Sequence, residues 1–239
     1  MALHRAAGTW SHQVDAFIAL TEFQRQRVVD AGLPASRVFV KPNFYPGNPA
    51  VVPWGQRQPY VVFAGRLTAE KGVATLIRAW QSWGADAPEL RILGGGELRG
   101  DFEAMAAGLQ VRFLGQVDAA EAQRQIAHAS LLVLPSEWFE GFPMVVREAF
   151  AFGTPAAVSD LGPLPSIVRR GESGVVFEAA NSDSLLQTVR TAWQAPAILQ
   201  NLGQGARQAF DRLYNEDANY QVLMEIYEQA IAQSAKTKS

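Results

Sequence analysis

Short apolar runs alternate with amphipathic helical patterns along most of the chain. Apolar runs of strand length fall at 60–64, 90–93, 111–114, 131–134, 156–159 and 175–177. Helical periodicity appears at 72–83, 98–107, 119–128, 143–152, 164–169, 184–194, 197–210 and 216–235. Strands that alternate with helices are typical of a parallel sheet covered on both faces. We therefore predict an α/β fold with a doubly wound, Rossmann-like parallel sheet.

A shorter unit of the same kind precedes this region. The apolar run 16–20 leads into Thr21, and Gln24 stands three residues later, which is a capping-box arrangement at a helix start. The helix is expected to end at Gly32, and 38–40 is a second strand candidate. These elements predict a short N-terminal β-α-β annex. Residues 42–59 are rich in proline and show no periodicity, as expected of a linker.

Composition narrows the class of protein. The chain has 239 residues, of which 48% are hydrophobic, and a net charge of −2. This apolar content suits a packed core and excludes a disordered or collagen-like chain. A near-neutral balance gives no overall field for nucleic acid, and no apolar run approaches the ~20 residues of a transmembrane helix. With no cysteine and no signal-peptide pattern after Met1, we predict a soluble, cytoplasmic protein that binds no nucleic acid.

The loop after the strand 60–64 is the first candidate site. In an open parallel sheet, ligands bind beyond the carboxyl ends of the strands. This loop holds Gly65, Arg66 and Lys71. A glycine lets the backbone approach a ligand, and two cations near a helix N-terminus suit a diphosphate. The alternative is a pair of solvated surface cations, with Lys71 paired to Glu70.

Two glycine loops follow the next strands. Gly94 opens a run of three glycines, which offers exposed amides or simply a tight turn. A dinucleotide fingerprint would need glycine at Arg99, and no Gly-Lys-Ser/Thr follows as a Walker loop requires. Gly115 ends the following strand, where the backbone of Gln116 and Val117 could meet the edge of a base. For this loop, ordinary core packing is the alternative.

The loop after the strand 131–134 carries the strongest candidates. Pro143 suits the first turn of a helix, and Gly141 and Phe142 before it leave amides that can meet a ligand. Glu140 lies in the loop and Glu148 more than a turn into the helix, so both can face one ligand. Carboxylates accept paired hydrogen bonds, which suits the vicinal hydroxyls of a sugar or ribose. The alternative, acids favoured by the helix dipole, explains Glu148 poorly because its helix is otherwise apolar.

Other catalytic patterns are missing from the sequence. The three histidines lack metal-ligand spacing, no Asp-x-Asp pair occurs, and there is no Gly-x-Ser-x-Gly elbow. We therefore expect no metal and no cofactor.

Taken in order, these motifs resemble the donor-binding domain of retaining glycosyltransferases of family 4. The set consists of Gly65-Arg66 with Lys71, then Gly94-Gly95-Gly96, Phe113-Leu114-Gly115, and Glu140 with Glu148 at E-x7-E spacing. The passage 148–155 is similar to the segment after the second glutamate in that family. The resemblance covers about 60–184 and implies the GT-B fold, in which two Rossmann-like domains face across a cleft.

The resemblance implies a role for each loop. The catalytic residues would be Arg66 and Lys71, which hold the diphosphate of a UDP- or GDP-sugar and stabilise the leaving group, and Glu140, which bonds the donor sugar. Glu148 would bond the ribose hydroxyls. The other donor-binding positions would be Gly65, Gly94, Gly115, Val117, Gly141, Phe142 and Pro143. The implied reaction transfers a hexosyl unit to a hydroxyl acceptor with retention and without a metal.

The resemblance also divides the chain. Residues 1–41 would be a remnant of an N-terminal acceptor domain, 42–59 the linker, 60–215 the nucleotide-sugar donor-binding domain, and 216–239 a C-terminal crossover helix. Family members have a full acceptor domain, so this chain would be mainly the donor-binding half, completed by the missing domain or a partner chain. Ser166 departs from the family, in which many members have a glutamate there.

Several alternatives stay open from the sequence. The chain could be a non-catalytic sugar-nucleotide-binding module, a subunit of a split transferase, or a GT-B-like epimerase or phosphorylase, since fold alone does not decide function. No lysine environment typical of a pyridoxal-dependent phosphorylase is evident, and a dehydrogenase would need the dinucleotide glycines.

Overall fold

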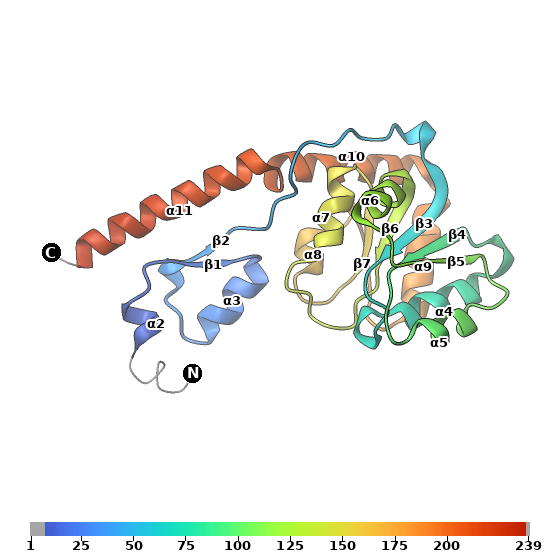
Figure 1. Cartoon of the computed structure of the whole chain (residues 1–239), viewed down its shortest axis with the longest axis horizontal. Coiled ribbons are helices and arrows are strands. Elements are labelled where there is room, and N and C mark those ends of the chain that lie inside the picture. Colours follow the sequence, from blue (N-terminus) through green and yellow to red (C-terminus); the bar gives the residue numbers. More distant parts are fainter. Residues whose placement is uncertain (1–7, 238–239) are drawn as a thin grey trace. The chain divides into compact units, whose positions relative to one another are not determined.

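The computed structural model describes residues 8–237, which form two compact units (Figure 1). The larger unit comprises Asn48–Arg212, and the smaller comprises Met1–Gly47 with Leu213–Ser239. The larger unit begins inside the segment predicted as a linker, so that residues 48–59 belong to it.

A six-stranded parallel sheet forms the centre of the larger unit. Its strands are β3 (Gln58–Ala64), β4 (Glu89–Leu93), β5 (Val111–Gly115), β6 (Ala129–Leu134), β7 (Ala156–Ser159) and β8 (Gly174–Phe177). The spatial order is β5-β4-β3-β6-β7-β8, and all neighbours pair in parallel. This is the 3-2-1-4-5-6 order of the Rossmann fold, with its switch point between β3 and β6. The predicted doubly wound parallel sheet is confirmed.

Helices cover both faces of this sheet. They are α4 (Val73–Trp83), α5 (Arg99–Met105), α6 (Ala119–His128), α7 (Met144–Ala151), α8 (Leu164–Ile167), α9 (Ser182–Trp193) and α10 (Pro196–Leu213). Helix α4 packs on α5 and α9 on one face, and α6 packs on α7 and β3 on the other (Figure 1). Every residue of β6 and β7 is buried, as expected of central strands covered on both sides.

Some helix and strand limits differ from the sequence prediction. Helix α7 begins at Met144 because Pro143 has extended backbone and serves as the N-cap. Helix α8 ends at Ile167, two residues early, because Val168 is extended. Helix α9 begins at Ser182 because the Asn181 side chain accepts a hydrogen bond from Ser184 N and caps it there. The segment 42–59, predicted to be without regular structure, contains the 3-10 turn η2 (Trp54–Gln56) and the first two residues of β3.

Two arginines bind the carboxyl end of α7. Arg57 Nη2 donates to Phe152 O over 2.7 Å, and Arg207 Nη1 donates to Ala151 O over 2.7 Å. Cations at this end complement the helix dipole and satisfy the last carbonyl groups. Burial lowers the pKa of Arg57 to about 10. Because this value is still well above 7, the guanidinium stays charged at neutral pH. The two contacts hold the helix that follows the predicted Glu140 loop.

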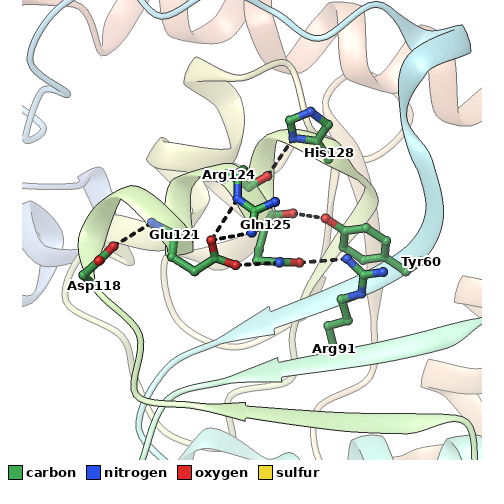
Figure 2. Close-up of polar contacts among 7 residues, drawn as sticks. All are labelled: Tyr60, Arg91, Asp118, Glu121, Arg124, Gln125 and His128. Carbon is green, nitrogen blue, oxygen red and sulfur yellow. Dashed lines mark hydrogen bonds and ion pairs between the residues drawn. The ribbon is translucent and has the colours of Figure 1, made fainter.

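A polar network joins α6 to the amino-terminal half of the sheet (Figure 2). Tyr60 Oη donates to Gln125 O over 2.6 Å, and Arg91 Nη1 donates to Gln125 Oε1 over 2.9 Å. The Gln125 amide in turn donates to Glu121 Oε1 over 2.7 Å, and Arg91 stacks on the Tyr60 ring. Burial raises the pKa of Tyr60 to about 12, although Arg91 acts against that shift. These side chains lie toward the opposite end of the strands from the predicted ligand loops, so we assign them to the scaffold.

The smaller unit contains the predicted β-α-β annex. Its elements are α2 (Thr9–His12), β1 (Phe17–Ala19), α3 (Glu22–Asp30), the 3-10 turn η1 (Ala35–Arg37), β2 (Val38–Val40) and α11 (Glu216–Thr237). Strands β1 and β2 pair in parallel. The predicted cap is present, since Thr21 Oγ1 accepts from Gln24 N, while Gln24 Oε1 accepts from Leu20 N. Helix α11 is bound to this unit by Asn219 Nδ2, which donates to Pro42 O over 2.6 Å.

Candidate functional site

The predicted loops meet at the carboxyl ends of β3, β4, β5 and β6. Gly94 N donates to Gly115 O over 2.8 Å, and Gly65 N donates to Leu93 O over 3.0 Å. A Cβ on Gly94 would lie 1.9 Å from Gly65 O, which is a severe clash. Gly94 also has φ +125°, a backbone conformation that disfavours any side chain. The structure thus gives the Gly94 loop a packing role. Its part in ligand binding stays a prediction, as does that of Gly65.

The β3 and β6 loops make the closest approach. Gly72 follows the 3-10 turn η3 (Ala69–Lys71) with φ +68°, and a Cβ on it would lie 1.9 Å from Pro135 O. The backbone of Glu137 donates to Glu70 O over 2.9 Å, and Thr75 Oγ1 donates to Glu137 Oε1 over 2.6 Å. These contacts fix the loop after β6 against the start of α4. They lie at the switch point of the sheet, where doubly wound folds bind ligands.

Lys71 and Glu140 form an ion pair at this junction. Lys71 Nζ lies 2.6 Å from Glu140 Oε1, and the side chains are only 20% and 16% exposed. The resemblance to family 4 implies one site for both residues, and the structure brings them together. The alternative in which Lys71 pairs with Glu70 is wrong, because Glu70 pairs with Arg66 instead, over 3.4 Å.

A pocket of about 460 Å³ opens beside this ion pair. Its lining residues are Arg66, Glu70, Lys71, Trp138, Phe139 and Glu140. The Arg66 side chain is 74% exposed, so its guanidinium can reach a ligand with little desolvation. A backbone hydrogen bond lowers the pKa of Glu70, with smaller contributions from Thr68 and the two cations. The pocket thus presents cations and carboxylates side by side, which suits a ligand with both anionic groups and hydroxyls.

Aromatic side chains in the same pocket were not predicted. Trp138 is 68% exposed and Phe139 is 50% exposed. Phe139 lies against the turn at Gly162, where a Cβ would be 2.9 Å from the Phe139 ring. No periodic pattern in the sequence separates the exposed Trp138 from the buried Trp80.

Glu148 lies on α7, outside the lining of this pocket. Its side chain is 27% exposed, and its carboxylate is 3.7 Å from the Arg147 guanidinium. Burial raises the pKa of Glu148, and Arg147 partly opposes that shift. A partly buried carboxylate needs a polar partner, and this longer-range ion pair with its chain neighbour is a weak one. Pro143 is buried at the N-cap of the same helix, and Gly141 is exposed.

A further cation lies against the end of β5. Arg99, at the start of α5, lies against Gly115, where a Cβ would be 2.9 Å from Arg99 Nη1. Arg99 also pairs with Glu103 over 2.7 Å. Val117 follows in the same loop and is partly exposed. In the sequence, Arg99 stands out only as a position where a dinucleotide motif would have glycine.

Two features are absent from the described residues, 8–237. Within them, no three or more His, Cys, Asp or Glu side chains are grouped so as to hold a metal ion. No helix among them is both long and apolar enough to cross a membrane.

The fold and this site define a class of protein. A 3-2-1-4-5-6 parallel sheet with cations and carboxylates at its switch point is a Rossmann-like domain suited to an anionic, hydroxyl-rich ligand. Residues 47–209 match the family model described as "Glycosyl transferases group 1", a range that nearly coincides with the larger unit. The chain belongs to the group 1 glycosyltransferase family.

The chain is also similar to named proteins. The chain is 31% identical over 209 residues to an exopolysaccharide phosphotransferase of Streptomyces coelicolor, a match covering 83% of this chain and 22% of that protein. It is 27% identical over 240 residues to a phosphatidyl-myo-inositol mannosyltransferase of Mycobacterium leprae, a match covering 96% of this chain and 63% of that protein. The chain thus spans less than two thirds of the length of each.

A solved structure shows the same fold. The HepE protein of Anabaena, solved in complex with UDP and glucose, superposes with a TM-score of 0.76 at 18% identity. The match covers 91% of this chain and 63% of that one. Together with the sheet order, it confirms the expected GT-B type of α/β fold.

Proposed function

We propose that this chain binds a nucleotide diphosphate sugar and forms the donor half of a retaining hexosyltransferase of family 4. The observation that carries the proposal is the Lys71–Glu140 ion pair beside Arg66 at the switch point of the sheet. A donor of this kind has a diphosphate, a sugar and a ribose in sequence. The pocket offers cations and a carboxylate in the β6 loop, and a second carboxylate lies on α7, outside the pocket lining.

The two cations would bind the diphosphate. Arg66 offers a planar fork of donors and Lys71 a point charge, and the two come from one loop. When the bond between the sugar and the diphosphate breaks, negative charge develops on the leaving phosphate. Fixed cations beside that oxygen stabilise the transition state without a metal or other cofactor.

The carboxylates would orient the sugar and the ribose. Glu140 faces the pocket and can accept hydrogen bonds from sugar hydroxyls, helped by the backbone of Gly141, Phe142 and Pro143. Glu148, with its raised pKa and single weak ion pair, would gain two strong bonds from ribose hydroxyls. The backbone at 115–117 would meet the base.

The relatives support this proposal in part. HepE was solved with UDP and with UDP-glucose, and the Mycobacterium leprae relative is named a mannosyltransferase. Both are longer than the matched region, so an acceptor domain or a partner chain would complete the cleft here. We also propose a cytoplasmic location, which is compatible with a nucleotide-sugar ligand and with a chain that has no cysteine.

Calorimetric titration of the 239-residue chain tests the proposal. The ligands are UDP-glucose, UDP-N-acetylglucosamine and GDP-mannose, each beside its free nucleoside diphosphate, in buffer with EDTA. We expect the ligands of one nucleotide, UDP or GDP, to bind, and we expect their affinity to be the same with and without EDTA. Failure of all of these ligands to bind would contradict the proposed function, and dependence on a divalent metal would contradict its metal-free chemistry.

A further inference from the structure

Ser136 is a buried hydroxyl that the proposed function does not use. It stands two residues beyond the end of β6 and is fully buried. Its Oγ donates to Glu140 Oε1 over 2.6 Å, and its carbonyl accepts from Ser159 Oγ over 2.6 Å. Ser159 is the last residue of β7 and is also fully buried. The Glu140 carboxylate is thus connected through Ser136 to the end of a central strand.

The same carboxylate oxygen receives a second donor. Lys71 Nζ and Ser136 Oγ each lie 2.6 Å from Glu140 Oε1. Among the hydrogen bonds formed within residues 8–237, none ends on Glu140 Oε2. One oxygen is therefore held by two donors, and the other is left for a ligand in the pocket.

A phosphate ligand would change this balance. Lys71 is paired before any anion arrives, so binding a diphosphate draws at least part of its hydrogen bonding away from Glu140. A partly buried carboxylate that loses a charged partner is destabilised unless another donor remains. Ser136 is that donor, and it cannot follow the ligand because its own backbone is fixed by Ser159.

We propose that Ser136 is a positioning residue that holds the Glu140 carboxylate toward the pocket while Lys71 engages the diphosphate. The proposal rests on the proposed function, since it takes Glu140 as the group that bonds the donor sugar. Without a sugar, water in the pocket can solvate Glu140. With the sugar bound, that water is displaced, and the orientation of the carboxylate depends on Ser136.

Binding of a matched pair of ligands tests this. In S136A, we expect the affinity for UDP to stay within about twofold of the parent and the affinity for UDP-glucose to fall about tenfold, as for a lost bond to a charged group. GDP and GDP-mannose are used if the parent prefers them. S136C replaces the hydroxyl with a weak donor, so it should resemble S136A. The parent has no cysteine, so the new thiol has no partner for a disulfide within the chain.

Ser130 provides the matched control. It is a nearly buried serine of β6 whose Oγ donates to Gln58 O, near the amino end of the strand. S130A should change neither affinity, even where its melting temperature falls as far as that of S136A. An equal loss of UDP and UDP-glucose binding in S136A, or no loss, would overturn the proposal, because either result means that Ser136 has only a structural role.

A measurement without nucleotide separates this proposal from the proposed function. The chain has only four lysines, so acylation of Lys71 can be followed by mass spectrometry against Lys41 in the same molecule. If Ser136 holds Glu140 on Lys71, the relative labelling rate of Lys71 should rise several-fold in S136A and not in S130A. If the parent binds neither ligand pair, the proposed function fails, and an unchanged labelling rate overturns the positioning role as well.

Discussion

Lys71 Nζ lies 2.6 Å from Glu140 Oε1, although the two residues are 69 positions apart in the chain. The contact follows from topology, because their loops leave the adjacent central strands β3 and β6. Side chains after two such strands meet at the switch point. The ion pair therefore both fastens the β6 loop and places a cation where an anionic ligand would bind.

Loss of the Lys71 ammonium should weaken nucleotide binding. In K71A we expect the affinity for the preferred nucleoside diphosphate to fall by about 10- to 100-fold, as for a lost charge-assisted hydrogen bond. Calorimetric titration measures this directly. The control is R112A, which removes an exposed arginine of β5 and should leave the affinity unchanged. Equal affinities in K71A and the parent would mean that the phosphates bind elsewhere.

Glu148 should make the ligand-free chain sensitive to pH. Burial raises its pKa, so the folded state holds a proton on this carboxyl that the unfolded state gives up. Stability should therefore fall as the pH rises from the ordinary value of 4.5 through the raised value. E148Q removes this titration and should melt higher than the parent at pH 7, with the difference shrinking toward pH 4. A difference that does not vary with pH would contradict this explanation.

Gly72 should tolerate no side chain. A Cβ there would lie 1.9 Å from Pro135 O, and its φ of +68° strains any other residue. We expect G72A to cost more than about 2 kcal/mol in the free energy of unfolding, and to loosen the β6 loop around Glu140. In G100A the new methyl meets nothing within 4 Å inside helix α5, so this variant should gain up to about 1 kcal/mol. Urea denaturation of both variants checks the contrast.

Tyr60 should affect stability and leave ligand binding alone. Y60F removes the hydrogen bond to Gln125 O and should cost about 1 kcal/mol in urea denaturation. Since burial raises the Tyr60 pKa from 10 to about 12, the parent should lose stability across that alkaline interval and Y60F should lose less. Changed nucleotide affinity in Y60F would show that the network in Figure 2 extends to the site.

The sheet and the site loops could be predicted because they depend on local patterns in the sequence. Apolar runs of central strands and helical periodicity are local patterns, and the rule that ligands bind beyond strand ends converts them into a place for Lys71 and Glu140. Ser136 and Ser159 could not be found this way, because a lone serine has no periodicity and its partner depends on strand order. The same holds for Tyr60 and Arg91, whose contact depends on the register of β3 and β4.

The exposure of the tryptophan side chains and the role of Gly94 could not be predicted from the sequence. The sequence could not show that Trp138 is exposed while Trp80 is buried, since both are followed or preceded by polar residues. Gly94 was considered for ligand approach, but the structure shows a backbone contact with Gly65 that no spacing rule indicates. Helix ends such as that at Val168 depend on a single extended residue.

The central claim is that Lys71 and Arg66 bind the diphosphate of a nucleotide sugar. A crystal structure of the chain with the nucleotide sugar that binds in calorimetry tests this most directly, because it shows where the diphosphate lies. We expect phosphate oxygens within hydrogen-bond distance, about 3 Å, of Lys71 Nζ and the Arg66 guanidinium, with the sugar against Glu140 and the ribose against Glu148. A diphosphate bound away from Lys71 and Arg66 would contradict it.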